Sequence, residues 1–290
     1  MNLQEIVKAK NIKKPPKLKA VNEPRAMEIK YLKLLKQLAN ELKNDVRKEI
    51  IPLLKTSTIE TQANDSVSDI LVALARLAAK YFNINFFAEN TANLIVSGID
   101  KSNRERFFNS INSSIGVDLK DIVQQEGISD LIALQKSKNV ALIKSIPSEF
   151  LKEVEIVVQN GIANGLRHEA IAKQLSGIKD IKSTFGKLEN RIKMIARNET
   201  SSINATLNKA RQENLGIQYY TFETSRDERV RPSHQIMQGK ICRWDDPTVY
   251  KDSLEDKKWK KRSSIGGVEK HPGIDFSCRC VSLAIIEDIE

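Results

Sequence analysis

The segment HPGIDFSCRC, residues 271–280, concentrates side chains that can bind a metal or act as nucleophiles. It contains His271, Cys278 and Cys280, in a 290-residue chain with three cysteines and three histidines in total. Cysteine thiolates and histidine imidazoles are the usual zinc ligands, and a closed structural zinc site needs four of them. The two cysteines are too close in sequence to bridge each other without strain. The segment therefore allows a metal site, a catalytic thiol, or a buried pair of reduced cysteines.

A second segment, TSRDERVRPSHQIMQGK, supplies a further ligand, His234. Together His234, His271, Cys278 and Cys280 could hold one structural zinc and join the loops of a small C-terminal domain. Cys-x-Cys is a weaker zinc signal than paired Cys-x-x-Cys, so a reduced pair that packs as small hydrophobes stays open. No Asn or Asp is an evident orienting partner for a Cys–His pair. We therefore predict no catalytic residue and no cofactor other than this zinc.

Alternating charges precede His234 in the same segment. Asp227, Arg229 and Arg231 lie within five positions, and such residues can lock a loop through charge-assisted hydrogen bonds. Arginines can also bind phosphate or the carboxylates of a partner. We interpret the three residues as a structural lock. The alternative is a nuclease-like enzyme in which the arginines bind phosphate and His234 is the general base.

A third segment, IARNETSS, lies in the middle of a predicted long helix. Arg197, Ser201, Asn204 and Asn208 fall on one helical face, opposite the apolar residues. We interpret this face as solvated, with an ion pair to the C-terminal domain. Arg197 and Glu199 are the candidates for that structural or interaction role.

The elements that must position these residues are mainly helices. Apolar residues three and four apart predict a long amphipathic helix from Asn22 to Leu54, then further helices, and a last long helix over 183–215. After Gly216, the stretches IQYYTFET, KICRW and CRCVSLAII predict short strands. The predicted fold is a mainly α N-terminal helical domain followed by a small C-terminal α+β domain with a short antiparallel sheet.

Charge separates an N-terminal arm from the helical part. The net charge is +10, and residues 1–20 supply +5 of it through six Lys and one Glu. Paired prolines in KKPPKLK disfavour a helix there. We expect a basic flexible arm at 1–21, a helical region at 22–182, and a long helix with a small α+β cap at 183–290. A basic arm favours a polyanionic partner. The candidate DNA contacts are Lys8, Lys10, Lys13, Lys14, Lys17 and Lys19.

Hydropathy and cysteine content give an expected compartment. No apolar run approaches the roughly 20 residues that span a bilayer, and the N-terminus lacks the apolar stretch of a secretory signal. An odd number of cysteines in a large chain argues against a disulfide framework. We expect a cytosol-like compartment and no membrane partner.

Four motifs occur in a fixed order between Asn139 and Val281: NVALIKSIPSEF, IARNETSSINATLNKARQENLGI, TSRDERVRPSHQIMQGK and HPGIDFSCRC. In this order they resemble the bacteriophage Mu F-like minor head proteins, the portal-associated head morphogenesis family. The sequence departs from the family pattern at Asn198, where Thr or Asp is expected, and at Tyr220, where Trp is common.

The resemblance implies a structural assembly protein rather than an enzyme. It implies a low-copy virion component that associates with the portal vertex during capsid assembly in the host cytoplasm. In the virion such a component lies in the head interior or at the portal vertex, and it can enter the host with the DNA. The implied partners are the portal protein, the scaffold and major capsid proteins, and packaged double-stranded DNA. The region 22–182 would bind the portal, and 183–290 would be the Mu F-like head morphogenesis domain.

Overall fold

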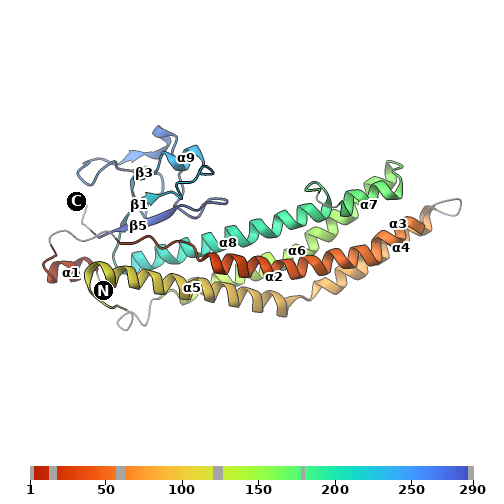
Figure 1. The fold of residues 1–290 in the computed structure, drawn as a ribbon, viewed down its shortest axis with the longest axis horizontal. Helices are drawn as coiled ribbons and strands as arrows, with labels where there is room; N and C mark the ends of the chain where they lie inside the picture. Colours follow the sequence, from red (N-terminus) through yellow and green to blue (C-terminus); the bar gives the residue numbers. More distant parts are fainter. Residues whose placement is uncertain (1–2, 13–17, 57–62, 120–126, 178–179, 287–290) are drawn as a thin grey trace. The chain divides into compact units, whose positions relative to one another are not determined.

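The computed structural model describes residues 3–12, 18–56, 63–119, 127–177 and 180–286. Helices predominate and a short antiparallel sheet follows, which confirms the predicted fold class (Figure 1). The helices are α1 (Leu3–Ala9), α2 (Arg25–Asp45), the π-helical turn η1 (Val46–Ile50), α3 (Ile51–Thr56), α4 (Ala63–Phe82), α5 (Asn85–Ile115), α6 (Ser129–Ala163), α7 (His168–Ser176), α8 (Thr184–Asn214), α9 (Pro232–Gln235) and the 3-10 helix η2 (Arg262–Ile265). The strands are β1 (Tyr219–Glu223), β2 (Ile241–Arg243), β3 (Val249–Tyr250), β4 (Lys260–Lys261) and β5 (Val281–Ile285).

The chain divides into two compact units, and neither is continuous in sequence. The first unit comprises Met1–Met27, Val96–Gln135 and Arg197–Glu290, and the second comprises Glu28–Ile95 and Lys136–Ala196. These units cut across the expected boundaries at 22 and 183. The reason is that α5 and α8 each give one end to the first unit and the other end to the second.

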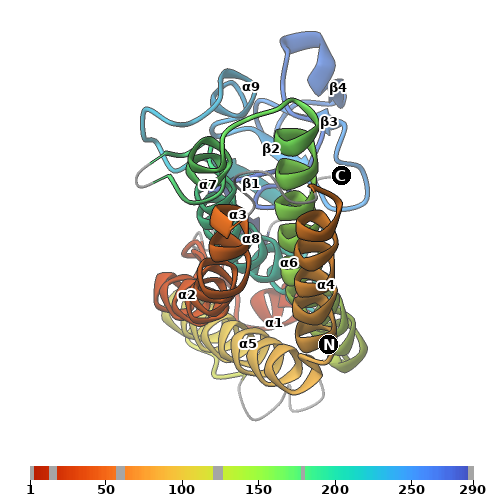
Figure 2. The same cartoon turned by 90° about the vertical axis from the view of Figure 1, so that its right-hand side faces the viewer.

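The described residues of the second unit form helices and the turns that connect them. The predicted long helix is formed by α2, η1 and α3 in direct succession. Its buried apolar residues include Tyr31, Leu35, Leu38, Leu42, Val46 and Ile50. Its α3 packs against α4 and α7 (Figure 2). Tyr31 of α2 donates a hydrogen bond to Asn139 of α6 at 3.0 Å, and Lys43 pairs with Glu189 of α8. Burial of each Leu or Ile on these faces contributes about 1.5–3 kcal/mol, so apolar packing is the main stabilising term.

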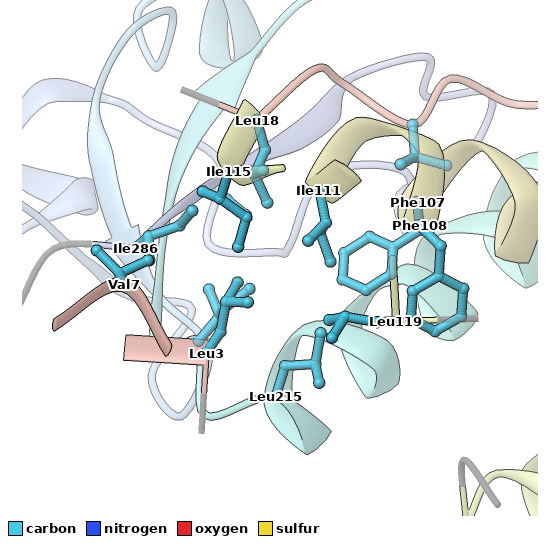
Figure 3. Packing of buried hydrophobic residues seen from close by; sticks show 13 residues of the cluster. Leu3, Val7, Leu18, Phe107, Phe108, Ile111, Ile115, Leu119, Leu215 and Ile286 are labelled. Carbon is cyan, nitrogen blue, oxygen red and sulfur yellow. The ribbon is translucent and has the colours of Figure 1, made fainter. Parts of the chain in front are cut away.

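A cluster of buried apolar residues joins the N-terminal residues of the first unit to α5 and to the end of the sheet (Figure 3). Leu3 and Val7 of α1 and Leu18 lie in it with Phe108 of α5 and Ile286. In its described residues the expected flexible arm is therefore packed. The three apolar positions Leu3, Ile6 and Val7 are too few to stand out as a periodic pattern, and the paired prolines lie outside the described residues.

The sheet of the first unit has the strand order β2-β1-β5 and is antiparallel, as predicted for its three segments. On β1, Tyr220 lies opposite Cys242 and Ala284. Buried residues alternate with half-buried ones along this strand, so that Tyr220 and Phe222 face the core. The short pair β3-β4 was not predicted.

A fully buried arginine supplements the small core beside this sheet. The Arg262 guanidinium donates to the carbonyls of Val249, Val268 and Lys270 and to the Tyr220 hydroxyl, at 3.0–3.2 Å. A buried charge persists only when its donors are satisfied, so these four partners fix the loops around β3 and β4.

Among the described residues, no single helix is long and apolar enough to cross a membrane. The two helical segments Ser68–Phe82 and Asn85–Ile115, which are bent by 48° relative to each other, meet the criteria of length and apolar content only as a pair.

Candidate metal centre

Three of the predicted zinc ligands converge in the first unit. His234 lies on α9, which begins with Pro232 in its first turn, and Cys278 and Cys280 lie just before β5. Nδ1 of His234 is 3.5 Å from Sγ of Cys278 and 3.4 Å from Sγ of Cys280. All three side chains are buried, and their ligand atoms lie within 4.8 Å of one another.

The polar face of α8 holds the segment that carries the cysteines. Ser201 Oγ donates to the carbonyl of Cys278 at 2.7 Å, and Asn198 Oδ1 accepts from the backbone N–H of Ser277 at 2.8 Å. Gly273 has φ +83°, and a Cβ there would come within 2.6 Å of Ala205 of α8. Only glycine combines this conformation with such a close approach to a helix.

This face of α8 is buried, which corrects the expectation of a solvated face. Asn204 Nδ2 donates to the carbonyl of Val21 at 3.0 Å, and Asn208 Nδ2 donates to Ser282 Oγ at 2.9 Å. Arg197 donates to the carbonyl of Ser277 at 3.3 Å, and Glu199 is buried. A polar helical face appears solvated in a sequence because the loop carbonyls that cover it come from distant residues.

The second ring nitrogen of His234 is held by a carboxylate that the sequence reasoning missed. Nε2 of His234 lies 3.1 Å from Oδ2 of Asp275, which also pairs with Lys270 at 2.7 Å and Arg231 at 3.1 Å. Burial opposes ionisation of Asp275, but these cations and the Phe276 backbone outweigh it and lower its pKa to about 2. An ionised carboxylate only accepts hydrogen bonds, so Nε2 of His234 carries a proton, and Nδ1 is the ring nitrogen that faces the two sulfurs.

One thiolate is favoured at the cysteine pair. Sγ of Cys278 accepts backbone N–H groups from Gly273 at 3.4 Å and from Cys280 at 3.3 Å. Hydrogen bonds from Cys280 and His234 hold the pKa of Cys278 well below its usual range. The adjacent Cys278 sulfur raises the pKa of Cys280, and its hydrogen bond raises the pKa of His234.

His271, the fourth predicted ligand, lies in a different environment. Its Nδ1 is 2.8 Å from the Tyr220 hydroxyl, and its ring packs on Trp244 with centroids 5.0 Å apart. Burial lowers its pKa to about 4. The third cysteine, Cys242, is also outside the group, and burial raises its pKa to about 11. The structure thus brings together three of the four predicted ligands.

An arginine-lined recess adjoins the three ligands. The Arg229 guanidinium is 3.0 Å from the Asp227 carboxylate, and Arg231 donates to the carbonyl of Phe276 at 2.6 Å. Arg231 thereby joins the α9 segment to the segment that holds the cysteines. The recess is lined by Arg197, Ser225, Asp227, Arg229, Val230, Arg231, His234, Ser277, Cys278, Arg279 and Cys280.

The predicted DNA contacts are only partly described. Lys8, Lys10 and Lys19 are exposed, and Lys10 Nζ donates to the carbonyl of Gly116 at 2.9 Å. The other three, Lys13, Lys14 and Lys17, lie outside the described residues.

Comparison with known proteins finds a family model that matches part of the chain. Residues 152–283 match the model of a family described as phage Mu protein F like protein. Over its whole length the chain is 31% identical to an uncharacterized protein of Haemophilus influenzae and spans 60% of that protein. A stretch of 98 residues, 33% of the chain, is 36% identical to an uncharacterized protein of Methanocaldococcus jannaschii and spans 14% of it. No solved structure matches the chain.

Proposed function

Because residues 152–283 belong to the phage Mu protein F-like family of head morphogenesis proteins, we propose that this protein is a minor head protein that acts in capsid assembly at the portal vertex. The family match is the observation that carries the proposal, and it takes in α8, α9 and the three converging ligands. The proposed partners are the portal protein and, during assembly, the scaffold and major capsid proteins. The proposed location is the virion, on the inside of the head.

Exposed aromatic residues in the second unit support a protein contact there. Phe82 at the end of α4 is 84% exposed and Phe86 at the start of α5 is 80% exposed. Large apolar side chains this accessible are typical of interaction surfaces. We assign the portal contact to this α4–α5 junction, within the helical region expected to bind the portal.

Co-expression with the cognate portal protein tests the assignment. The full chain should co-elute with the portal on size exclusion, and the double variant Phe82→Ser with Phe86→Ser should weaken the association at least about tenfold, since buried aromatic contacts dominate interface energies. Phe276→Ser, which replaces a 56% exposed aromatic of the first unit, is the matched control and should retain association. Absence of any association, even with scaffold and capsid proteins present, contradicts the proposal.

Contact with packaged DNA is the second part of the proposed role. Lys8 and Lys10 are exposed on or beside α1, whose Leu3 and Val7 are anchored in the core. This arrangement fixes positive charge on the surface of a folded unit. Such charge supports sequence-independent contacts with phosphates, as a protein in a DNA-filled head would require.

The surroundings of His234 support an assembly role over the nuclease alternative. Its Nδ1 faces two thiols and its Nε2 faces Asp275. A general base for phosphodiester cleavage needs a ring nitrogen within reach of the substrate or its attacking water. Both nitrogens of His234 already have partners within the protein.

A further inference from the structure

We infer that Nδ1 of His234, Sγ of Cys278 and Sγ of Cys280 hold one zinc ion, and that its fourth coordination position opens to the arginine-lined recess. This inference concerns a metal site within the first unit, and it does not depend on the assembly role. Within the described residues the group contains these three ligands and no fourth. It therefore differs from the closed four-ligand site that the sequence predicts.

The interatomic distances fit tetrahedral zinc. Bonds of about 2.3 Å to sulfur and about 2.0–2.1 Å to nitrogen, at a tetrahedral angle, place the nitrogen and each sulfur about 3.5 Å apart. The observed separations from His234 Nδ1 are 3.5 Å to Cys278 and 3.4 Å to Cys280. Both nitrogen–sulfur separations are therefore those that a single zinc ion would impose.

Both sulfurs lie at the same ring nitrogen. Nδ1 of His234 can make one hydrogen bond, either as a donor or as an acceptor. Here two sulfurs are directed at the same nitrogen at nearly equal distances. A cation among the three atoms would bind the nitrogen lone pair and both thiolates at once.

The groups around the ligands are those that metal sites require. Asp275 accepts from Nε2 of His234, and so fixes the ring with Nδ1 free to coordinate. Backbone N–H groups of Gly273 and Cys280 point at Sγ of Cys278 and stabilise thiolate charge. Two thiolates also neutralise Zn²⁺, so the buried group carries no net charge.

His271 does not complete this site. Its Nδ1 is engaged by the Tyr220 hydroxyl at 2.8 Å and its ring packs on Trp244. The remaining position instead faces the recess, whose lining includes all three ligands together with Arg229, Arg231 and Arg279. Guanidinium groups beside an open position favour water or a small anion as the fourth ligand.

Cobalt titration of the metal-free full chain under reducing conditions tests the site. Cobalt should saturate at about one ion per chain, with sulfur-to-cobalt charge-transfer absorption, and elemental analysis of the purified protein should find about one zinc. His234→Ala, Cys278→Ser and Cys280→Ser should each weaken binding by at least about 100-fold. The wild-type titration needs no substitution, so a variant that fails to fold does not decide the outcome.

Two matched variants separate this site from the alternatives. Cys242→Ser removes the cysteine outside the group and His271→Gln removes the fourth predicted ligand, and both should retain one cobalt. Inorganic phosphate or thiocyanate should shift the visible cobalt bands, since an anion can enter the open position. The metal site is contradicted if the wild-type protein binds no cobalt, or if Cys242→Ser loses as much cobalt binding as the ligand variants do. The open fourth position is contradicted if His271→Gln loses cobalt binding, or if neither anion shifts the visible bands of the bound cobalt.

Discussion

At the scale of single residues, buried polar groups stabilise a domain whose apolar core is small. Arg262 donates to the Tyr220 hydroxyl at 3.1 Å, and that hydroxyl lies 2.8 Å from Nδ1 of His271. The hydroxyl can donate to His271 only while Nδ1 is unprotonated. Burial together with the charges of Lys209 and Arg262 keeps the ring neutral, with a pKa of about 4.

The lowered pKa of His271 predicts how the stability of the protein depends on pH. The pKa of His271 is about 4 in the folded protein and 6.5 as an ordinary histidine. The unfolded chain therefore binds a proton first as the pH falls, so the stabilising contribution is complete above about pH 6.5 and declines toward pH 4. After allowance for partial exposure, the loss in unfolding free energy should be about 1–2 kcal/mol.

Urea unfolding of wild type and His271→Gln between about pH 7 and about pH 4.5 measures this loss. Carboxylates titrate equally in both proteins, so the difference between the two curves isolates His271. The wild-type curve should fall more steeply. Parallel curves would show that His271 is not held neutral by its surroundings.

The candidate site could be predicted in part from residue types alone. His234, Cys278 and Cys280 stood out because few residues of their kind occur in the chain. Asp275 did not, although it lies three residues before Cys278, because nothing in the sequence shows that its carboxylate reaches α9. His271 was grouped with the ligands by its nearness in sequence, but Tyr220 and Trp244 place it elsewhere.

At the scale of elements, the packing of α1 means that DNA contacts of the basic residues 1–20 should be tested by substitution and not by deletion. Deletion of residues 1–20 would remove Leu3, Val7 and Leu18 from the core along with the lysines. Each buried apolar side chain contributes about 1.5–3 kcal/mol, so a deletion would confuse loss of folding with loss of DNA contacts.

Replacing Lys8, Lys10 and Lys19 by Gln removes charge and keeps the apolar anchor. Each phosphate contact contributes about 0.9 to the slope of log affinity against log salt, so the slope for double-stranded DNA should become shallower by about 2 to 3. Fluorescence anisotropy at several salt concentrations measures it.

The matched control replaces Lys30, Lys33 and Lys36, three exposed lysines of α2, by Gln. It removes the same net charge from the second unit and should leave most of the slope intact. Equal effects of the two triple variants would mean that only total charge matters, and would contradict a DNA contact at the N-terminal lysines.

At the scale of the whole molecule, local patterns identified the elements but not the division into units. The positions of α2, α4 and α8 follow from apolar spacing, and β1, β2 and β5 from aromatic and β-branched residues. Which part of α5 or α8 belongs to which core depends on contacts between residues far apart in sequence. Periodicity contains no information about such distant contacts.

The proposed role is tested most directly by the composition of phage heads. Heads purified from a host that produces the complete phage should be analysed by quantitative mass spectrometry, with the portal and major capsid proteins as internal references. The account predicts that this protein is present in far fewer copies than the major capsid protein and remains with the portal when the heads are dissociated. Heads that contain the portal but lack this protein, both as assembly intermediates and when mature, would contradict it.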